Sequence, residues 1–128
     1  MKRTIVSTDK APGAIGPYSQ AVKTDTMVFV SGQLPLNPAT GELVTNDIAA
    51  ETRQSMDNVK AILEAAGSSL AQVVKTTVFI ADMDDFPAIN AVYDTYFDSD
   101  PPARACVEVA RLPKDARVEV EAVALLNP

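Results

Sequence analysis

Hydrophobic residues recur along this chain at two spacings, and each spacing predicts a different kind of element. Residues 104–109 and 117–126 alternate apolar and polar positions, as half-buried strands do. Gly32 is expected to end the third strand of the chain. Short runs of β-branched and apolar residues predict the earlier strands at residues 4–7, 19–24, 27–31 and 73–80.

A first helix is expected over residues 48–66, where apolar residues lie three and four positions apart. Asn46 or Asp47 would cap its start, because a short polar side chain there accepts hydrogen bonds from the first backbone N–H groups. Gly67 would follow its end. The side expected to be buried carries Met56, Val59, Ile62, Leu63 and Ala66.

A second helix is expected to start near Asp84 or Asp85, since Pro87 then falls in the first turn, where proline is tolerated. The resulting order, β-β-β-α-β-α-β-β, indicates an α+β domain with a mixed sheet and both helices on one face. The 128 residues suffice for one domain, so we expect a single domain over residues 1–128. The other face of the sheet would be bare, which favours an oligomer that covers it.

Composition narrows the location and the chemistry. No apolar run approaches the roughly 20 residues of a membrane span, and the N-terminus lacks the pattern of a signal peptide. With one cysteine, Cys106, and no other to pair with in the chain, a reducing compartment fits, and we expect a cytoplasmic protein. Without histidine, the chain offers neither a Ser-His-Asp triad nor the usual tetrahedral zinc site, so acid–base work falls to other side chains or water.

The charge balance bears on partners. The chain has 17 acidic and 11 basic residues, a formal net charge of −6 and no basic run. Nucleic-acid binding depends largely on Lys and Arg that neutralise phosphates, so this composition argues against nucleic acid as a partner.

The last two predicted strands carry the candidate chemistry. Arg104, Cys106 and Glu108 share one face of the first, and Glu119 and Glu121 share one face of the second. If the two strands form an antiparallel hairpin with their valines toward the core, the guanidinium, thiol and carboxylates line one groove. The alternative is a solvated charged face of an amphipathic hairpin, because exposed Arg and Glu neighbours are common and nearly neutral in energy.

The sequence around these strands resembles a known family. Residues 102–113 read PARACVEVARLP, and VEVE follows at residues 118–121. Together with AIGPYSQA at 14–21, VSGQ at 30–33, NPATG at 37–41, QSMDNV at 54–59 and KTTVF at 75–79, this order resembles the Rid (reactive intermediate deaminase, YjgF-type) family, RidA subgroup. The resemblance covers roughly residues 5–126.

This resemblance implies a chorismate-mutase-like fold of the bacillary type and a homotrimer with active sites in the clefts between subunits. It implies that Arg104 holds the substrate carboxylate, assisted by the backbone N–H of Cys106, and that Glu119 positions and activates the attacking water. The remaining pocket residues implied are Tyr18, Ser31, Gly32 and Asn90.

The implied reaction is hydrolysis of 2-aminoacrylate and 2-aminocrotonate, through 2-iminopropanoate and 2-iminobutanoate, to 2-keto acids and ammonia. The residue chemistry fits this task. An arginine can grip the permanent carboxylate of a 2-imino acid with two parallel hydrogen bonds. A protonated imine carbon is already electrophilic, so the reaction requires no metal, cofactor or covalent nucleophile, and a carboxylate acting through water can serve.

Several of these positions have simpler interpretations. A lone strand cysteine such as Cys106 is more often a small buried hydrophobe, and Tyr18 alone would anchor a loop. Ser31 would end a strand, and Asn90 would lie on a helix surface. Glu121 shares the face of Glu119, and the resemblance alone selects Glu119.

Two other functions stay open at this stage. One is a non-catalytic or regulatory module that binds small carboxylates in the same cleft. The other is a ribonuclease or translation inhibitor, against which the acidic charge and missing histidine count. The loop at residues 97–102 has Pro101 where relatives often carry an aromatic residue, so the preferred size of substrate is open as well.

Overall fold

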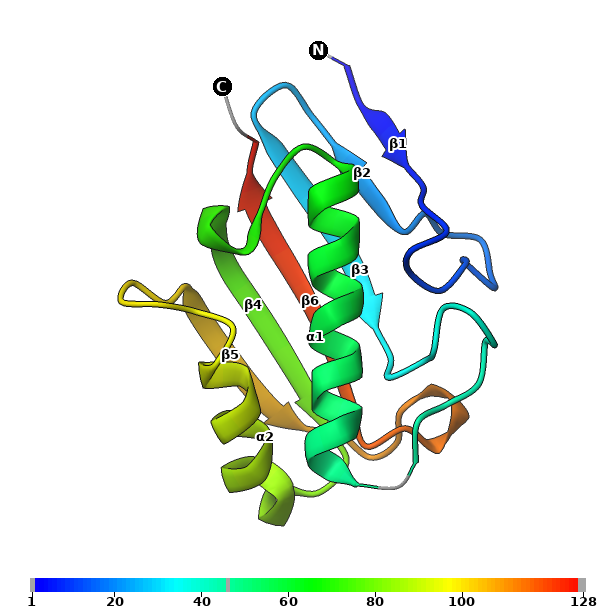
Figure 1. Ribbon diagram of the computed structural model, residues 1–128, viewed down its shortest axis with the longest axis vertical. Coiled ribbons are helices and arrows are strands. Elements are labelled where there is room, and N and C mark those ends of the chain that lie inside the picture. The colour runs from blue at the N-terminus through cyan, green and yellow to red at the C-terminus, as the bar shows by residue number, and fades with distance from the viewer. Residues whose placement is uncertain (1, 46, 127–128) are drawn as a thin grey trace.

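A computed structural model describes residues 2–45 and 47–126, which fold into one six-stranded sheet with two α-helices. The helices lie together on one face of the sheet (Figure 1). This architecture confirms the predicted α+β class, the mixed sheet and the placement of both helices. The elements in chain order are β1 (Thr4–Val6), β2 (Ala21–Lys23), β3 (Met27–Gln33), α1 (Ile48–Ala65), β4 (Val73–Ile80), α2 (Phe86–Asp94), β5 (Ala103–Glu108) and β6 (Val118–Leu125).

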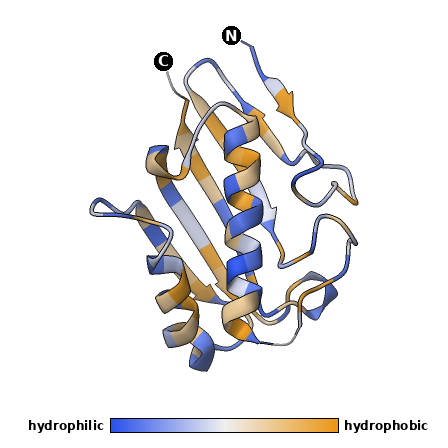
Figure 2. Cartoon of the chain, viewed as in Figure 1, coloured by the Kyte–Doolittle hydropathy of each residue, from blue (hydrophilic) through white to orange (hydrophobic). Residues whose placement is uncertain are grey.

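The core lies between α1 and the sheet. Met56, Ile62 and Leu63 on α1 are fully buried, as are Val118 and Val120 on β6. The side of α1 turned away from the sheet is mostly hydrophilic (Figure 2). The predicted spacing of apolar residues therefore identified the buried side of this helix.

Residues next to α1 explain where the helix starts and where it ends. The side chain of Asp47 accepts a hydrogen bond from the backbone N–H of Ala49 at 3.1 Å, which makes Asp47 the N-cap. The other candidate cap, Asn46, lies outside the described residues. Gly67 follows the helix with a φ of 87°, the left-handed conformation that glycine adopts without steric cost.

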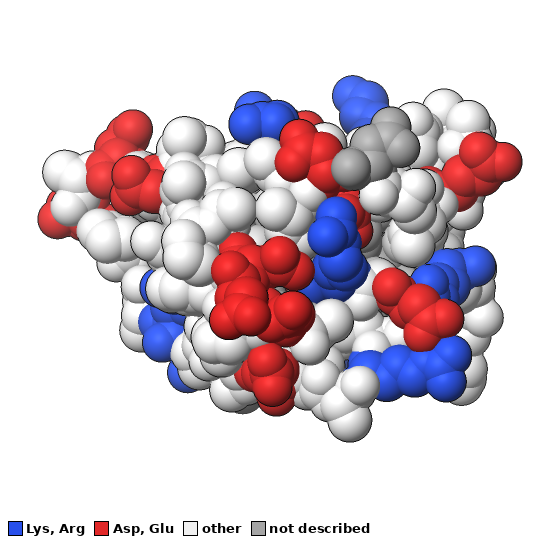
Figure 3. Space-filling view, turned by 90° about the horizontal axis from the view of Figure 1, so that it is seen from below, with Lys and Arg blue, Asp and Glu red and all other residues white. Residues whose placement is uncertain are grey.

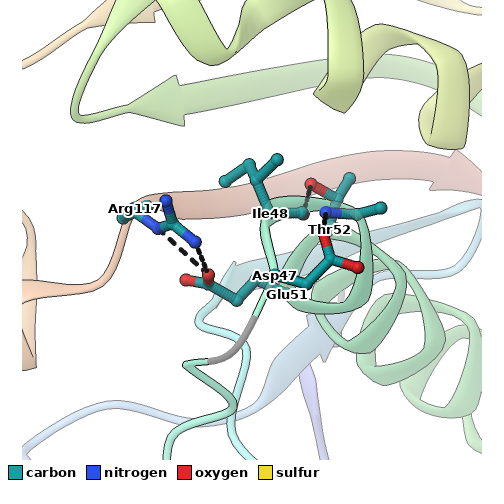
Figure 4. Close-up of polar contacts among 6 residues, drawn as sticks. Asp47, Ile48, Glu51, Thr52 and Arg117 are labelled. Carbon is teal, nitrogen blue, oxygen red and sulfur yellow. Dashed lines mark hydrogen bonds and ion pairs between the residues drawn. The ribbon is translucent and has the colours of Figure 1, made fainter.

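An ion pair joins the start of α1 to the segment that enters β6. Glu51 is 1% exposed, and its Oε2 accepts hydrogen bonds from Nε of Arg117 at 3.0 Å and from Nη2 (Figure 4). Glu51 raises the pKa of Arg117 through this hydrogen bond. A buried carboxylate needs a nearby positive charge, and Arg117 supplies that charge to Glu51.

The sheet order corrects the predicted hairpin. The strands are ordered β1-β2-β3-β6-β4-β5, so β4 lies between the last two strands of the chain. β5 pairs in parallel with β4, and β6 pairs antiparallel with both β4 and β3. The chain crosses over through α2 before β5, a connection that parallel strands require.

The third strand is also longer than predicted. β3 continues through Gly32 to Gln33, and its pairing with β6 shifts register between Val30 and Gln33. Ser31 and Gly32 together face one residue of β6 at this β-bulge, which bends the strand and re-aims the side chains beside it. The predicted strand end at Gly32 is therefore wrong, and the glycine marks the bulge instead.

The face of the sheet opposite the helices is partly apolar. Phe29 on β3, Val107 on β5 and Leu125 on β6 are 46%, 40% and 43% exposed. The registers of Phe29 with Val123, Met27 with Leu125, and Val107 with Phe79 place these residues on the face that no helix of the described chain covers. No helix in the described ranges is long and apolar enough to cross a membrane.

Candidate active site

Glu119 extends from β6 over the bulge in β3. A Cβ atom built on Gly32 would lie 2.8 Å from Cδ of Glu119, closer than real Cβ contacts come. The two strands can therefore hold this carboxyl group against the backbone only because residue 32 is glycine. The structure thus brings two of the predicted site residues, Gly32 and Glu119, into contact.

The carboxyl group of Glu119 lines a cavity of about 280 Å³. Tyr18 stands at its edge, half exposed, and its hydroxyl accepts a 3.4 Å hydrogen bond from the backbone N–H of Ile15. The hydroxyl of Ser31 donates to the backbone carbonyl of Ser19 at 2.6 Å. The walls are mainly apolar, and the cavity is lined by Pro12, Gly13, Ile15, Tyr18, Ser31, Gly32, Gln33, Leu34, Leu36, Pro113 and Glu119.

Two buried amide side chains hold the loops that form these walls. Gln20 is 4% exposed; its Nε2 donates to the carbonyls of Thr8, Ala11 and Pro12, and its Oε1 accepts from the backbone N–H of Thr8. Asn58 on α1 is 1% exposed, and its Nδ2 donates to the carbonyls of Leu34 and Leu36 at 3.1 and 2.9 Å. Neither residue is among the site residues predicted from the sequence. A polar amide on the buried side of a predicted helix is the signal that could have identified Asn58.

The environment of Glu119 changes its acidity. Burial raises the pKa of Glu119 above the ordinary value of 4.5, and the neighbouring Glu121 carboxylate raises it further. Both effects disfavour the ionised form, one by loss of solvation and one by like charge. Glu119 is therefore a carboxyl group of raised pKa at the edge of a largely apolar cavity, an environment common for acid–base residues.

Arg104 lies on β5, at the far edge of the sheet. Its Nη1 donates a 2.8 Å hydrogen bond to Oδ1 of Asn90 on α2, so the structure brings these two predicted residues together. Within residues 2–45 and 47–126, Arg104 forms no ion pair. Pro101 and Pro102 line the same hollow, which also includes Asn90, Tyr93, Asp94 and Arg104.

Cys106 follows two residues later on the same face of β5. Its side chain packs against the core, and burial raises the pKa of the thiol while Arg104 acts in the opposite direction. A partly buried thiol of raised pKa is a poor nucleophile, which agrees with the interpretation of this cysteine as a small hydrophobe. β5 is an edge strand, so every second backbone N–H along it faces away from β4.

The two groups of predicted residues lie on opposite faces of the sheet. Arg104 is paired in register with Thr76, whose side chain is 1% exposed on the helix-covered face. Glu119 is paired with Phe79, on the opposite face. An antiparallel hairpin of the last two strands would put Arg104 beside the glutamates and Val107 toward the core. This hairpin does not form, because β5 pairs with β4 and turns Val107 to the open face. One chain therefore holds Arg104 and Glu119 apart, on opposite faces of its sheet.

Comparison with known proteins places the chain in a family. The family model described as Endoribonuclease L-PSP matches residues 8–126. A protein of Escherichia coli strain K12 named 2-iminobutanoate/2-iminopropanoate deaminase is 55% identical over 128 residues, with 98% of each chain covered. A human protein of the same name is 51% identical over 126 residues, covering 98% of this chain and 92% of the human one.

Solved structures agree with this placement. Escherichia coli TdcF with bound serine is 50% identical and matches with a TM-score of 0.93, covering 97% of this chain and 99% of that one. The yjgF gene product of Escherichia coli is 51% identical with a TM-score of 0.92, covering 97% and 99%. The chain belongs to the Endoribonuclease L-PSP family, the YjgF-type family that its motifs resemble.

Proposed function

We propose that this protein hydrolyses 2-imino acids, the tautomers of 2-aminoacrylate and 2-aminocrotonate, to 2-keto acids and ammonia. The observation that carries the proposal is the pair of incomplete half-sites. One holds an arginine that has no ion-pair partner among the described residues, and the other holds a carboxylate of raised pKa in an apolar cavity. Relatives about 55% identical over their whole length are named 2-iminobutanoate/2-iminopropanoate deaminase. TdcF, a neighbour in structure, binds serine, which also carries a carboxylate beside an amino-bearing carbon.

The complete site is proposed to form between subunits of a homotrimer with a chorismate-mutase-like fold, each subunit a single domain over residues 1–128. Two features support assembly. Arg104 and Glu119 face opposite sides of their own sheet, so each needs the complementary residue of another copy. The open face also exposes Phe29, Val107 and Leu125, which an interface would cover. The cytoplasm is the proposed location.

Substrate binding rests on Arg104. Its guanidinium has N–H groups beyond the one bonded to Asn90, and two of them can donate in parallel to a carboxylate. We assign a further hydrogen bond to the backbone N–H of Cys106 on the edge strand. Tyr18, Ser31 and Gly32 of the neighbouring subunit would enclose the imine end of the substrate.

The chemical step is assigned to Glu119. The ionised carboxylate accepts a proton from water as the water oxygen bonds to the protonated imine carbon, which gives a carbinolamine. The protonated Glu119 then returns that proton to the nitrogen and the C–N bond breaks. The hydroxyl gives its proton to the regenerated Glu119 carboxylate as the keto acid forms, and Glu119 passes it to solvent. One water is consumed and one ammonia is released, with no change of oxidation state. The raised pKa of Glu119 makes it a stronger base than an ordinary glutamate, which favours the first of these proton transfers.

Two other functions predict different behaviour. The name of the family model raises a ribonuclease. The charge of −6 argues against it, and acidic and basic side chains are interspersed on the face where both helices begin, without a continuous basic patch (Figure 3). A binding module for small carboxylates would use the same arginine, yet it would not accelerate hydrolysis.

A coupled assay tests the proposal. Threonine or serine dehydratase generates the 2-imino acid, and keto-acid formation is followed with the wild type, Arg104→Ala and Arg53→Ala. Arg53 is an exposed arginine on α1, which makes its variant the matched control. We expect Arg104→Ala to lower kcat/KM about 10²-fold, as loss of a charge-assisted bidentate contact would, and Arg53→Ala to leave it unchanged. Keto-acid binding without acceleration by the folded wild type would contradict the deaminase and favour the binding module. A steeply salt-dependent affinity for RNA would favour the ribonuclease.

A further inference from the structure

Arg104 is held by one side of helix α2. Phe86, Asn90 and Tyr93 are four and three residues apart, so their side chains lie on the same side of the helix. Cζ of Arg104 lies 5.5 Å from the ring centroid of Phe86 and 4.8 Å from that of Tyr93. With the hydrogen bond to Asn90, three side chains of one helix fix the guanidinium on the neighbouring strand.

Tyr93 is itself restrained. Its ring is 6% exposed, and its hydroxyl lies 2.7 Å from Oγ1 of Thr76 on β4, which is 1% exposed. Thr76 is paired in register with Arg104 across β4 and β5. The ring of Phe97 packs against Tyr93 with centroids 4.9 Å apart. A buried hydroxyl pair at one end and a packed ring at the other leave Tyr93 little freedom to rotate.

None of the groups that hold Arg104 carries a charge. In the described part of the chain, Arg111 is paired with Asp115 and Arg117 with Glu51, whereas Arg104 contacts an amide oxygen and two ring faces. A carboxylate in their place would compete with an anionic ligand for the guanidinium. The observed partners orient the group and leave its net charge for the ligand.

We propose that Tyr93, restrained by Thr76, is a positioning residue that sets the orientation of Arg104 before a carboxylate binds. The benefit to catalysis rests on the proposed function, because the carboxylate is that of the 2-imino acid. A preoriented arginine loses less side-chain freedom when substrate binds, so the contribution of Tyr93 belongs to substrate affinity.

Four variants separate this role from simple packing. Tyr93→Leu removes the ring beneath Arg104, Tyr93→Phe removes only the hydroxyl, and Thr76→Val removes the other half of the hydroxyl pair while keeping its shape. Tyr96→Phe is the matched control. It also removes a tyrosine hydroxyl that bonds a neighbour, Asp57 on α1, but Tyr96 has no contact with Arg104 among the described interactions.

The first readout needs no catalysis. Nuclear magnetic resonance of protein with 15N-labelled arginine reports the order parameter of the Nε–Hε bond of Arg104. We expect a rigid group in the wild type and in Tyr96→Phe, with an order parameter of about 0.8, and a value below about 0.6 in Tyr93→Leu. Tyr93→Phe and Thr76→Val should give intermediate values, and they test the proposal even if Tyr93→Leu does not fold. An order parameter unchanged in these folded variants would overturn the proposal.

The second readout is kinetic. We expect Tyr93→Leu to raise KM about tenfold with kcat changed less than about threefold, because the contact to the carboxylate is present in both ground and transition states. In an Arg104→Ala background the same substitution should have no further effect on kcat/KM. A loss that persists undiminished in that background would show that Tyr93 acts through packing alone. If the wild type does not accelerate imine hydrolysis, the proposed function fails, and the order parameters still decide the role of Tyr93.

Discussion

The carboxyl group of Glu119 occupies the space in which a side chain at residue 32 would begin. A Cβ on Gly32 would approach Oε2 of Glu119 to 2.9 Å and Cγ to 3.1 Å. No residue larger than glycine therefore fits at position 32 while the carboxyl group keeps its place. The bulge in β3 brings the backbone into this position. The placement of the proposed base therefore depends on a residue without a side chain.

Gly32→Ala is expected to displace Glu119 and lower kcat by up to about 10²-fold, since a shift of about 1 Å at a reacting group can have that effect. The coupled assay and a thermal melt measure activity and fold together. Gly67→Ala is the contrasting variant. At Gly67 a Cβ would meet open space, but the φ of 87° is unfavourable for alanine. That variant should lose about 1 kcal/mol of stability and keep its activity. Full activity in Gly32→Ala would remove Glu119 from the mechanism.

Mixing two inactive variants tests whether sites form between subunits. Arg104→Ala and Glu119→Gln each destroy one half-site and leave the other intact. If the two are unfolded together and refolded as a mixture, about a quarter of the sites in random trimers should contain both wild-type residues. Activity near that fraction of wild type is expected in the coupled assay, and each variant refolded alone is the control. A mixture no more active than its components would contradict the shared site, and light scattering should give a mass near three times 13.6 kDa.

The pH dependence of activity should report the environment of Glu119. The residue acts as a base only when ionised. Its burial, and to a smaller extent the Glu121 carboxylate, raise its pKa above 4.5. kcat/KM is therefore expected to fall on acidification with a midpoint above 4.5. Glu121→Gln removes the like charge and should move this midpoint to lower pH, whereas Glu121→Asp keeps the charge and is the control. A midpoint equal in all three proteins would exclude Glu121 as a cause.

The raised pKa of Glu119 also makes stability depend on pH. Stability is expected to fall as pH rises, whereas activity is expected to rise. Since the pKa of Glu119 is raised in the folded state, its contribution to stability is present below the ordinary value of 4.5 and is lost as pH rises through the folded pKa. Glu119→Gln is therefore expected to raise the thermal midpoint relative to wild type more at about pH 7 than at about pH 4. Thermal melts at the two pH values measure this difference. A difference between variant and wild type that is equal at the two pH values, or larger at the lower one, would contradict it.

Removing either partner of the Glu51–Arg117 ion pair should lower the free energy of unfolding, but by unequal amounts. Arg117→Met leaves the carboxylate of Glu51, 1% exposed, without its counter-charge, and should cost about 3 kcal/mol of unfolding free energy. Glu51→Gln leaves Arg117, whose side chain is 41% exposed and can turn to water, so a smaller loss is expected. Urea unfolding of both variants gives the comparison. Equal losses would show that the burial of Glu51 does not decide the energy of the pair.

Local pattern predicted the elements well, because each element leaves its own spacing of apolar residues. β4 and α1 begin where they were expected to begin, and the cap at Asp47 follows from its side chain alone. The pairing of β5 could not be predicted from local pattern. Whether a strand joins its neighbour in sequence or crosses over through a helix depends on long-range packing.

The face of β5 was mispredicted for a related reason. Val107 is apolar yet points to the open face, and Arg104 is charged yet points toward the helices. The rule that apolar residues face the core fails where the second face of a sheet is apolar as well. The family resemblance selected Arg104 and Glu119 as site residues, and the structure adds that one chain holds them apart.

The proposed homotrimer would make the stability of this protein depend on its concentration, because its interface would cover the bare sheet face. Phe29, Val107 and Leu125 remain in contact with water in an isolated chain, and any association that covers them adds its free energy to that of folding. The thermal midpoint should therefore rise with protein concentration, and dilution should loosen the fold as well as the assembly. A newly made chain exposes these side chains until it associates, and until then they can form non-native contacts with other proteins.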